Sequence, residues 1–584
     1  MGRRRCGRDA PLKSKLEHRQ LLGTASETMN SSKFRNPEVL IAGAGPTGLV
    51  LAVWLTRLGV RVRIVDKLAA PETTSRAIGV QARTLEFYRQ IGFADTLIAH
   101  GRKAPGTNLW ISGRNAAHLC FHDMGGEISP FPYALVISQD EHEYLLIDHL
   151  AKLGVEVGRR TELVEFEEAG EQVRARLKQP DGTVEQCEAV WLVGCDGARS
   201  TVRESLKIEF PGGTYAHRFY VADVQAGGAA MNGEMHVALD ATDFLAIFPL
   251  PGEGRARLIG TVRDGAGNPN GNPSWQDVNK SVIESLHLNI ERVNWFSAYR
   301  VHHRVAAQFR KGCVFLAGDA AHIHTPVGGQ GLNTGVGDAV NLAWKLAAVL
   351  RGRADAALLH SYEPERTAFA RKLVDTTDRV FTGVTSPKAF DRWARLNLVP
   401  FLLPRLLKIA PVRQFLFRAI SQAAVSYRGS GLSEGRAGAV QGGDRLPWVK
   451  PALNQGGDNF TPLTSLDWQV HVYGEATPEI QALCHERKLP LHVFSWRPEM
   501  NRTGLMRNAL YLLRPDGHVA LANPEGSMTA VASYLDSRKL TPASPPVSKT
   551  NCEIGLATET NDALLQVQTD ALRTLAAGSP GTKE

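Results

Sequence analysis

The most regular hydrophobic pattern of the chain lies near its start. Val39 to Ala42 is an unbroken apolar run, and after a glycine cluster a second apolar stretch extends from Leu49 to Leu58. A strand covered on both faces is continuously apolar, whereas the longer stretch suits a buried helix. Arg61 to Val65 then predicts a second strand, which ends at Asp66. This order predicts a β–α–β unit with parallel strands.

The order of apolar strand, glycine-containing loop and helix occurs twice more. Residues 190–206 read VWLVGCDGARSTVRESL, in which an apolar run leads to Gly194 and a helix is expected to follow. Residues 313–317 (CVFLA) lead to Gly318-Asp319 and a glycine-rich loop. The helix after this loop is predicted to bury Val340, Leu342, Ala343 and Leu346.

Short alternating strands dominate the middle of the chain. Within residues 214–299 the segments GEMHVALD, DFLAIFPL and ARLIGTV are separated by turns such as DGAGNPNGNP. Residues 111–137 have a similar pattern. Together they predict a strand-rich region whose parts are separated in the sequence, so that the middle of the chain is discontinuous in the fold.

The later part of the chain changes character. Residues 396–421 are apolar and basic at helical spacing, which is compatible with a helix at a membrane surface. Their three prolines favour short helices packed between domains or at a dimer contact. After a glycine-rich linker, DWQVHVYG, a helix, LPLHVFSW and NALYLLRPDGHVALAN predict a β–α–β unit and a hairpin. Beyond residue 540 we expect a flexible tail.

Composition narrows the functional class. The 584 residues are 43% hydrophobic and 22% charged, which is enough for two or three cores. The net charge of +8 does not indicate nucleic acid, because residues 1–28 contribute +4 of it. No stretch reaches the roughly 18 apolar residues of a membrane span. We predict a cytoplasmic enzyme with no stable membrane insertion, a disordered extension over residues 1–36, and a natural start at Met29.

Cysteine usage indicates no metal and no disulfide. The chain has seven cysteines, with no CxxC pair and no Cys/His spacing typical of a metal site. Those in apolar runs are expected to be small core residues.

The loop after the first strand, Gly43-Ala44-Gly45-Pro46-Thr47-Gly48, has the spacing of a dinucleotide-binding loop. In such a loop the first glycine permits the turn, the second lets the backbone approach a pyrophosphate, and the third lets the helix pack on the strand. Asp66 follows Gly48 by 18 residues, where a carboxylate can accept hydrogen bonds from a ribose diol. The predicted dinucleotide site therefore comprises Gly43, Gly45, Pro46, Thr47, Gly48, Asp66 and Lys67.

The chain has three motifs in a fixed order: GxGxxG (Gly43 to Gly48), DG (Asp196-Gly197) and GD (Gly318-Asp319). With these motifs in this order, it resembles the FAD-dependent aromatic hydroxylases. These are the group A flavoprotein monooxygenases typified by p-hydroxybenzoate hydroxylase and phenol hydroxylase. The likeness covers residues 37–365 and extends more weakly to residue 540, and RAIGVQARTLE is closest to the aromatic polyketide hydroxylase branch. It implies an α/β fold with a Rossmann-like three-layer FAD-binding domain, an inserted mixed β-sheet substrate domain and a C-terminal thioredoxin-like domain.

The resemblance also implies domain boundaries. The FAD-binding domain would comprise residues 37–110, 138–213 and 300–390, and the substrate domain residues 111–137 and 214–299. A helical segment and linker (391–440), the thioredoxin-like domain (441–540) and the tail (541–584) would follow. Because the redox CxxC is absent, a structural role or a homodimer contact is expected for the thioredoxin-like domain.

Site residues can be carried over to matching positions. Gly43, Gly45 and Gly48 would cradle the FAD pyrophosphate, and Asp66 would bind the adenosine ribose. Asp319 would bind the ribityl hydroxyls, and the backbone of three residues would face the flavin pyrimidine. Those three residues are Gly331, Leu332 and Asn333. Arg76 and Arg83 would lie near the pyrophosphate, and Gln139 near the ribityl chain or phosphate. Asp196 and Arg199 would serve FAD and the nicotinamide donor, and Pro326 would lie beside the isoalloxazine and the substrate.

Several of these residues have an equally simple structural interpretation. Arg83 is as compatible with a salt bridge as with a phosphate contact, and Arg199 and Arg203 could pair with Glu204. For His322 and His324 we favour packing over proton transfer. Four aromatic residues of the predicted sheet are compatible with a substrate pocket or with an ordinary core: Phe244, Phe248, Trp295 and Phe296.

The chemistry implied by the resemblance is hydroxylation of a phenolic or polycyclic aromatic substrate. NADPH or NADH would reduce FAD, which would react with O2 to give a flavin hydroperoxide. Ile78 stands where phenol hydroxylases have an acidic residue, which favours a larger and more acidic phenol. A flavin-dependent reductase of the same scaffold and a non-catalytic FAD-binding protein are the alternatives.

Overall fold

The computed structural model describes residues 37–72, 78–239, 244–262, 273–324, 327–385, 388–451 and 457–542. The predicted extension at residues 1–36 lies outside the described residues, as do Arg76, Pro326 and the predicted tail from residue 543 onward.

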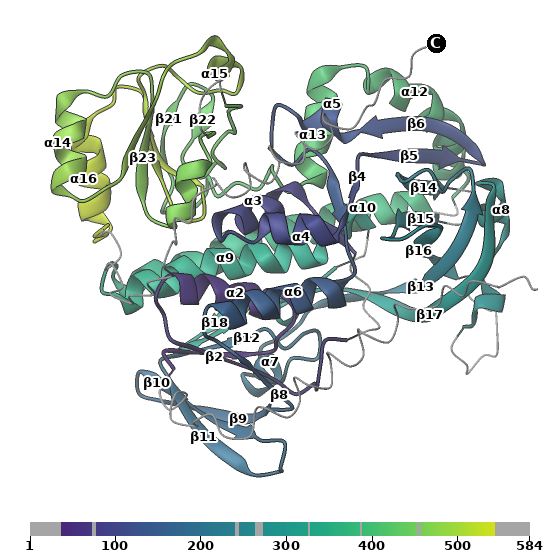
Figure 1. The fold of residues 1–584 in the computed structure, drawn as a ribbon, viewed down its shortest axis with the longest axis horizontal. Coiled ribbons are helices and arrows are strands. Elements are labelled where there is room, and N and C mark those ends of the chain that lie inside the picture. The colour runs from purple at the N-terminus through teal and green to yellow at the C-terminus, as the bar shows by residue number, and fades with distance from the viewer. Residues whose placement is uncertain are drawn as a thin grey trace, which may run out of the picture. The chain divides into compact units, whose positions relative to one another are not determined.

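A six-stranded sheet of order β18-β19-β12-β1-β2-β8 forms the centre of the first domain (Figure 1). All strands except β18 are parallel. The neighbouring strands β1, β12 and β19 each lead into one of the three glycine motifs. Because parallel strands end at the same edge, the three loops meet there. The strands are β1 (Val39–Ala42), β2 (Val62–Asp66), β8 (Val157–Arg159), β12 (Trp191–Gly194), β18 (Arg310–Lys311) and β19 (Val314–Leu316).

Two further layers cover this sheet. Helices α2 (Pro46–Arg57), α6 (Gln139–Lys152) and α9 (Gly331–Leu350) lie on one side, and the antiparallel sheet β11-β10-β9 lies on the other (Figure 1). Every side chain from Leu49 to Leu55 is fully buried, which explains why α2 is apolar on all faces. The predicted three-layer domain is therefore confirmed. Strands β9 to β11 are Glu162–Ala169, Gln172–Lys178 and Val184–Ala189.

The predicted mixed sheet has eight strands in the order β20-β17-β13-β16-β15-β14-β5-β6. Its neighbours are antiparallel except for the pair β14–β5. One edge strand, β20, comes from the segment after Gly318, so this segment belongs to both domains. The strands are β5 (Gly106–Ile111), β6 (Arg114–Cys120), β13 (Gly212–Gly228), β14 (Met235–Leu239), β15 (Phe244–Pro249), β16 (Arg255–Val262), β17 (Leu288–Val305) and β20 (His322–Ile323).

A small sheet, β3-β7-β4, is built from segments on both sides of β5 and β6 in the sequence. Its strands are β3 (Gly79–Val80), β4 (Arg102–Ala104) and β7 (Ala134–Val136). The helices that complete this part of the chain are α3 (Ala82–Gln90), α4 (Ala94–His100), α5 (Phe121–Gly125), α7 (Thr201–Ser205), α8 (Ser281–Ser285) and α10 (Tyr362–Thr385). A helical segment follows, with α11 (Ala389–Trp393), a π-helical turn (Ala394–Leu398), α12 (Val399–Leu406) and α13 (Ala410–Ile420).

The C-terminal domain has the strand order of a thioredoxin fold. Strand β23, helix α14 and strand β24 form a parallel unit, and β25 and β26 continue the sheet in antiparallel fashion before α16. Within the predicted linker, β21 and β22 form a hairpin that pairs with β26. The elements are β21 (Glu434–Ala437), β22 (Val440–Gln441), β23 (Gln469–Tyr473), α14 (Pro478–Glu486), β24 (Leu491–Phe494), α15 (Pro498–Arg502), β25 (Leu510–Leu513), β26 (Val519–Asn523) and α16 (Met528–Ser537).

Buried ion pairs join this domain to the helices of the first. Arg514, after β25, contacts both carboxylate oxygens of Glu365 on α10 at 2.8 and 3.0 Å. The ammonium group of Lys345 on α9 contacts the same carboxylate at 2.8 Å. All three side chains are at most 1% exposed. Because each of these three charges has an opposite partner, the cost of removing them from water is offset.

Candidate cofactor and substrate site

The three glycines of the first loop have different surroundings. Gly43 has φ +102°, and a Cβ there would lie 2.3 Å from the carbonyl oxygen of Cys195. A Cβ on Gly48 would lie 2.0 Å from the carbonyl oxygen of Gly43. In contrast, no atom lies within 4 Å of the Cβ position of Gly45. Gly43 and Gly48 are therefore required by the fold, whereas Gly45 faces open space of the kind a pyrophosphate needs.

Thr47 brings the glycine loop together with the GD segment and α9. A Cβ on Gly318 would lie 2.6 Å from the Thr47 hydroxyl oxygen, and one on Gly335 would lie 2.2 Å from it. Gly318 also has φ +63°, which a residue with a side chain rarely adopts. Pro46 is the first residue of α2, where its missing N–H costs nothing.

Asp66 closes the adenosine end of the predicted site. Its carboxylate accepts hydrogen bonds from the backbone N–H groups of Ala44 (2.7 Å) and Leu68 (2.8 Å), so it lies beside the glycine loop. Each carboxylate oxygen has a second lone pair for a ribose hydroxyl. Lys67 is exposed next to it.

The start of α6 contributes to the same region. Gln139 is its first residue and donates to the Glu143 carboxylate at 2.7 Å. Burial, together with the nearby charges of Asp66 and Glu72, raises the pKa of Glu143 to about 7. Glu143 is only 4% exposed and was not recognised from the sequence as part of this region.

The N-terminus of α9 supplies unpaired amides. Gly331, Leu332 and Asn333 are its first three residues, whose N–H groups have no acceptor within the helix. The Asn333 side chain is occupied elsewhere: it accepts from the backbone N–H of Gln81 and donates to the carbonyl of Gly79. The side chain thus fixes the helix start, while the backbone amides and helix dipole favour negative charge on a ligand.

Asp319 lies at the exposed tip of a short 3₁₀ turn whose other residues, Gly318 and Ala320, are buried. Asp338, a fully buried carboxylate on α9, fixes this turn from its buried side. Asp338 accepts from the Gly318 N–H (2.9 Å), from His322 Nε2 (2.6 Å) and from Arg366 Nε (2.6 Å). The charges of Arg366 and His322 lower the pKa of Asp338 to about 2 despite its burial.

Asp338 and Arg366 were missed by the sequence analysis. The only indication was a carboxylate within the apolar helix GVGDAVNLAWKL. His322 is 1% exposed and bonded to Asp338, which supports the packing role favoured for it.

The DG motif is joined to the GD turn by Arg203. This buried guanidinium donates to the carbonyl oxygens of Ala320 (3.1 Å) and Ala198 (3.0 Å), and its contact with Glu204 is longer, at 3.8 Å. Asp196 accepts from the Ser200 hydroxyl (2.6 Å) and the Val202 N–H (3.1 Å), so it holds the start of α7, whose N-cap is Ser200. Arg199 is exposed.

Arg83 is placed differently from the predicted phosphate contact. It is 3% exposed on α3, pairs with Glu86 at 3.0 Å and donates to the carbonyl of Asp516 in the C-terminal domain at 2.9 Å. Glu86 in turn pairs with Arg445. The geometry therefore favours the salt-bridge interpretation, because the guanidinium is directed toward the domain interface.

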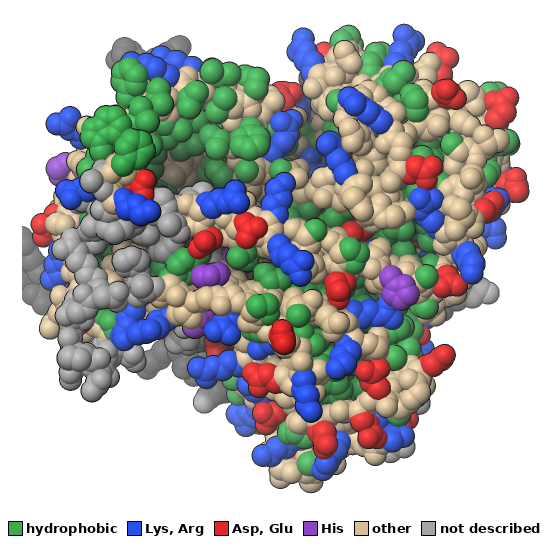
Figure 2. Space-filling model, turned by 180° about the vertical axis from the view of Figure 1, so that it is seen from behind, with side chains coloured by type: hydrophobic (Ala, Val, Ile, Leu, Met, Phe, Trp, Pro, Cys, Tyr) green, Lys and Arg blue, Asp and Glu red, His purple; other side chains and the backbone are tan. Residues whose placement is uncertain are grey.

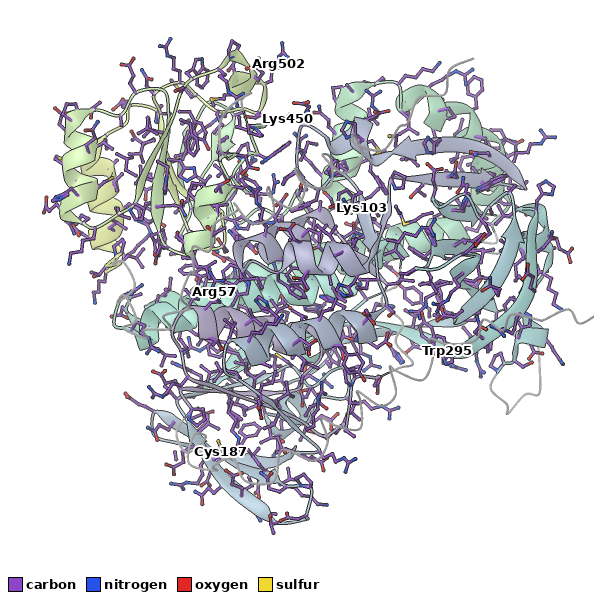
Figure 3. The ribbon with its side chains drawn as sticks, viewed as in Figure 1. Arg57, Lys103, Cys187, Trp295, Lys450 and Arg502 are labelled. Carbon is purple, nitrogen blue, oxygen red and sulfur yellow. The ribbon has the colours of Figure 1, made fainter. Side chains whose placement is uncertain are left out.

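Alternation along the large sheet separates the four candidate aromatic residues. Phe244, Phe248 and Trp295 lie in one cluster with Ile78 and Val136, on the face that meets β3 and β7. Trp295 is labelled at the side of this sheet in Figure 3. Phe296 belongs to the opposite face, stacked on Tyr220. Only the first three can therefore face a ligand on the inner side of the sheet.

This inner face connects directly to α9. Gly79 follows Ile78 and accepts the hydrogen bond from Asn333, so a single strand, β3, separates the aromatic cluster from the unpaired amides. The open cradle at Gly45, the acceptor at Asp66 and the amides of α9 together fit FAD.

Comparison with known proteins agrees with this geometry. The FAD binding domain family matches residues 36–377. The 6-methylpretetramide 4-monooxygenase of Streptomyces rimosus is 32% identical over 544 residues, covering 87% of this chain and 94% of that protein. The pentachlorophenol 4-monooxygenase of Sphingobium chlorophenolicum is 34% identical over 349 residues, covering 58% of this chain and 63% of that protein.

A solved structure shows the same architecture. The anhydrotetracycline hydroxylase OxyS of Streptomyces rimosus superposes with a TM-score of 0.70 at 29% identity, covering 87% of this chain and all of that one. The chain belongs to the FAD binding domain family and is one of its flavin-dependent aromatic monooxygenases.

Proposed function

We propose that this flavin-dependent monooxygenase hydroxylates a bulky polycyclic phenol, with NADPH or NADH as electron donor. The observation that carries the proposal is the aromatic inner face of the large sheet, which lies one strand away from the amides of α9. Relatives named for 6-methylpretetramide and anhydrotetracycline, which match most of the chain, support the same substrate class.

Ile78 supports a substrate that needs no carboxylate at this position. Its side chain is 4% exposed and packs with Val136 and Phe219. A carboxylate in this apolar cluster would lose its hydration without gaining a partner. A polycyclic phenol with a lowered pKa is already partly ionised near neutral pH and does not depend on a base there.

The protein's own residues bind and orient the reactants. The glycine loop and Asp66 would hold the adenosine diphosphate part of FAD, and Asp319 would hold the ribityl chain. The N–H groups of Gly331, Leu332 and Asn333 would stabilise negative charge on the flavin pyrimidine. Phe244, Phe248 and Trp295 would pack on the substrate rings and exclude water. Bound FAD supplies the electron transfer and the activation of O2.

The donor is proposed to dock without a domain of its own. Only one complete dinucleotide loop occurs in the sequence, and the exposed Arg199 beside the DG turn could receive the donor's phosphates.

The first test is the visible spectrum of the purified protein, followed by NADPH and NADH oxidation in air with simple phenols and polycyclic phenols. A flavin whose reduction is accelerated by the polycyclic class, with a product one oxygen atom heavier, is the expected result. Bound flavin and a product that gained hydrogen instead would favour the reductase alternative. Bound flavin without turnover of any compound would favour a non-catalytic protein.

A further inference from the structure

The described part of the chain exposes fifteen large hydrophobic side chains, and eight of them lie between residues 390 and 415. We call these eight the α11–α13 patch. Scattered exposed apolar residues are normal, whereas a concentrated patch marks an interaction surface. Figure 2 shows a broad area of hydrophobic side chains in the region of these helices, at the upper left. The patch consists of Phe390 (73% exposed), Trp393 (54%), Leu398 (40%), Phe401 (56%), Leu402 (40%), Leu406 (44%), Ile409 (49%) and Phe415 (68%).

These helices are attached to the protein along one side only. Phe417 is the one buried residue of α13. Its ring packs closely on Gly125 of α5, because a Cβ on Gly125 would lie only 2.3 Å from the ring. Helix α12 contacts β6 but has no buried residue. The packing between domains favoured by the sequence pattern therefore does not account for the apolar side chains of α12.

The patch lies in a strongly basic segment. Residues 388–420 contain seven Lys or Arg residues and a single acidic residue, a net charge of +6. Arg392, Arg405 and Lys408 are exposed, and the Arg405 guanidinium lies over the Phe401 ring at 3.6 Å. Short helices that combine Trp, Phe and Leu with Lys and Arg are typical of segments that lie in the membrane interface.

The charge of the segment distinguishes between two possible partners of the patch, a second copy of this chain and a lipid surface. In a symmetric dimer the patch of one copy would meet the same patch of the other, so two segments of charge +6 would face each other. An anionic lipid surface instead complements the charge and accepts the apolar side chains at the boundary between headgroups and acyl chains.

We propose that the α11–α13 patch docks the protein on the surface of an anionic lipid bilayer. The docking is peripheral, since no helix of the described residues is long and apolar enough to cross a membrane. Because α12 contacts β6 and α13 contacts α5, docking would bring the substrate domain to the bilayer. The inference goes beyond the proposed reaction and does not depend on it.

The test is co-sedimentation of the full FAD-loaded protein with vesicles of phosphatidylcholine and phosphatidylglycerol, compared with phosphatidylcholine alone. We expect binding to the anionic vesicles only, weakened at least tenfold when salt is raised from roughly 0.1 M to 0.5 M, where screening is stronger. The variants W393S/F401S/F415S and R392Q/R405Q/K408Q should each lose at least tenfold in binding.

Control variants change exposed residues of the same kind elsewhere. V164S/V184S/V493S replaces side chains that are 40%, 49% and 49% exposed, and R114Q/K178Q/R436Q replaces three exposed cations. Both should bind like the unchanged protein. No sedimentation of the unchanged protein with anionic vesicles would overturn the proposal, whether or not any variant folds. Light scattering that shows a dimer, abolished by W393S/F401S/F415S while vesicles bind nothing, would assign the patch to a second copy instead.

Discussion

Asp338 accepts a hydrogen bond from the backbone N–H of Gly318 at 2.9 Å, although twenty residues separate them. This contact fixes the turn that presents Asp319, and the same carboxylate is bonded to His322 and Arg366. A buried residue on α9 therefore sets the shape of a loop that is proposed to contact FAD.

Replacing Asp338 with Asn should weaken both folding and FAD binding. Asn keeps an acceptor for Gly318 but leaves the buried Arg366 without a counter-charge, which costs about 3–5 kcal/mol. We expect a lower thermal midpoint and, in FAD titrations followed by flavin fluorescence, at least a tenfold weaker affinity. D148N, at an exposed position of α6, is the control and should change neither quantity. A D338N protein with unchanged FAD affinity would contradict the positioning role.

Gly45→Ala should separate cofactor binding from folding. The backbone at Gly45 is extended (φ −77°), and its Cβ position is open, so the apo-protein should lose less than about 1 kcal/mol of stability. The added methyl group would occupy the space proposed for the pyrophosphate, and FAD affinity should fall at least tenfold. G429A, also at an open position, is the control. G48A should fail to fold, because its methyl group would lie 2.0 Å from a backbone oxygen. Tight FAD binding by G45A would exclude the proposed cradle.

Glu143 should make stability depend on pH. Its folded-state pKa of about 7 lies above the unfolded value, so the folded state binds a proton more tightly. The contribution of Glu143 to stability is therefore greatest below about pH 4.3, declines as pH rises toward 7 and is constant above it. E143Q removes this dependence and should be about 1–3 kcal/mol more stable than the unchanged protein at pH 8. Urea unfolding at pH 5 and pH 8 measures the difference, with the exposed E141Q as control. Equal slopes for E143Q and the unchanged protein would refute the assignment.

Trp295 and Phe296 provide a matched pair for the substrate face, since they are adjacent on β17 and face opposite sides. W295A should raise KM for a polycyclic phenol about tenfold through loss of roughly 1.4 kcal/mol of apolar contact, with less effect on a single-ring phenol. F296A should lower the thermal midpoint by disturbing its stack with Tyr220, with KM unchanged. Steady-state kinetics with both substrates checks this, and a KM effect confined to F296A would reverse the assignment of the two faces.

Removing one partner of the Arg514–Glu365 pair should be far more costly than breaking a surface pair. R514M leaves Glu365 with Lys345 as its one cationic partner and also removes the buried partner of Asp516, so we expect a loss of about 3–5 kcal/mol in urea unfolding. R487M breaks the exposed pair with Asp536 and should cost less than about 1 kcal/mol. The double variant R514M/E365M should not recover the loss, because it leaves the buried charges of Lys345 and Asp516 without these partners. Similar losses of unfolding free energy for R514M and R487M would show that the buried pair contributes no more to stability than the exposed one.

The parts of the fold predicted from the sequence are those set by local pattern. The run Val39–Ala42 and the spacing of Gly43, Gly45 and Gly48 determine the first β–α–β unit, because periodicity and backbone freedom act over a few residues. The thioredoxin-like order of the last domain could be read in the same way. The glycine-rich segment predicted as a linker contains a strand, β21. Its glycines Gly435 and Gly438 have positive φ values that form a hairpin, whereas the sequence pattern suggests an irregular linker.

What escaped prediction depends on contacts between distant segments. Arg83 and Asp516 are more than four hundred residues apart, so no spacing in the sequence indicates that this cation points toward the C-terminal domain. Asp338 looked like one carboxylate in an apolar helix, and its importance follows only from the approach of Gly318 and Arg366. The exposure of Phe401 and Trp393 likewise reflects the absence of a covering element within the described chain, which composition cannot reveal.

The pairing of β20 with β17 has a consequence for how the substrate range of this enzyme can evolve. Through the registers Arg304 with Ile323 and Val305 with His322, the segment after Gly318-Asp319 is attached to one edge of the eight-stranded sheet. Mutations that reshape β17 near Arg304 would disturb the cofactor loop at the same time, so selection has little freedom there. Strands β14 and β15 stand on the other side of β16 and are free of this coupling. New substrate preferences are therefore expected to arise by change at Met235, Val237, Phe244 and Phe248, where a ring of different size can be accommodated without altering how the flavin is held.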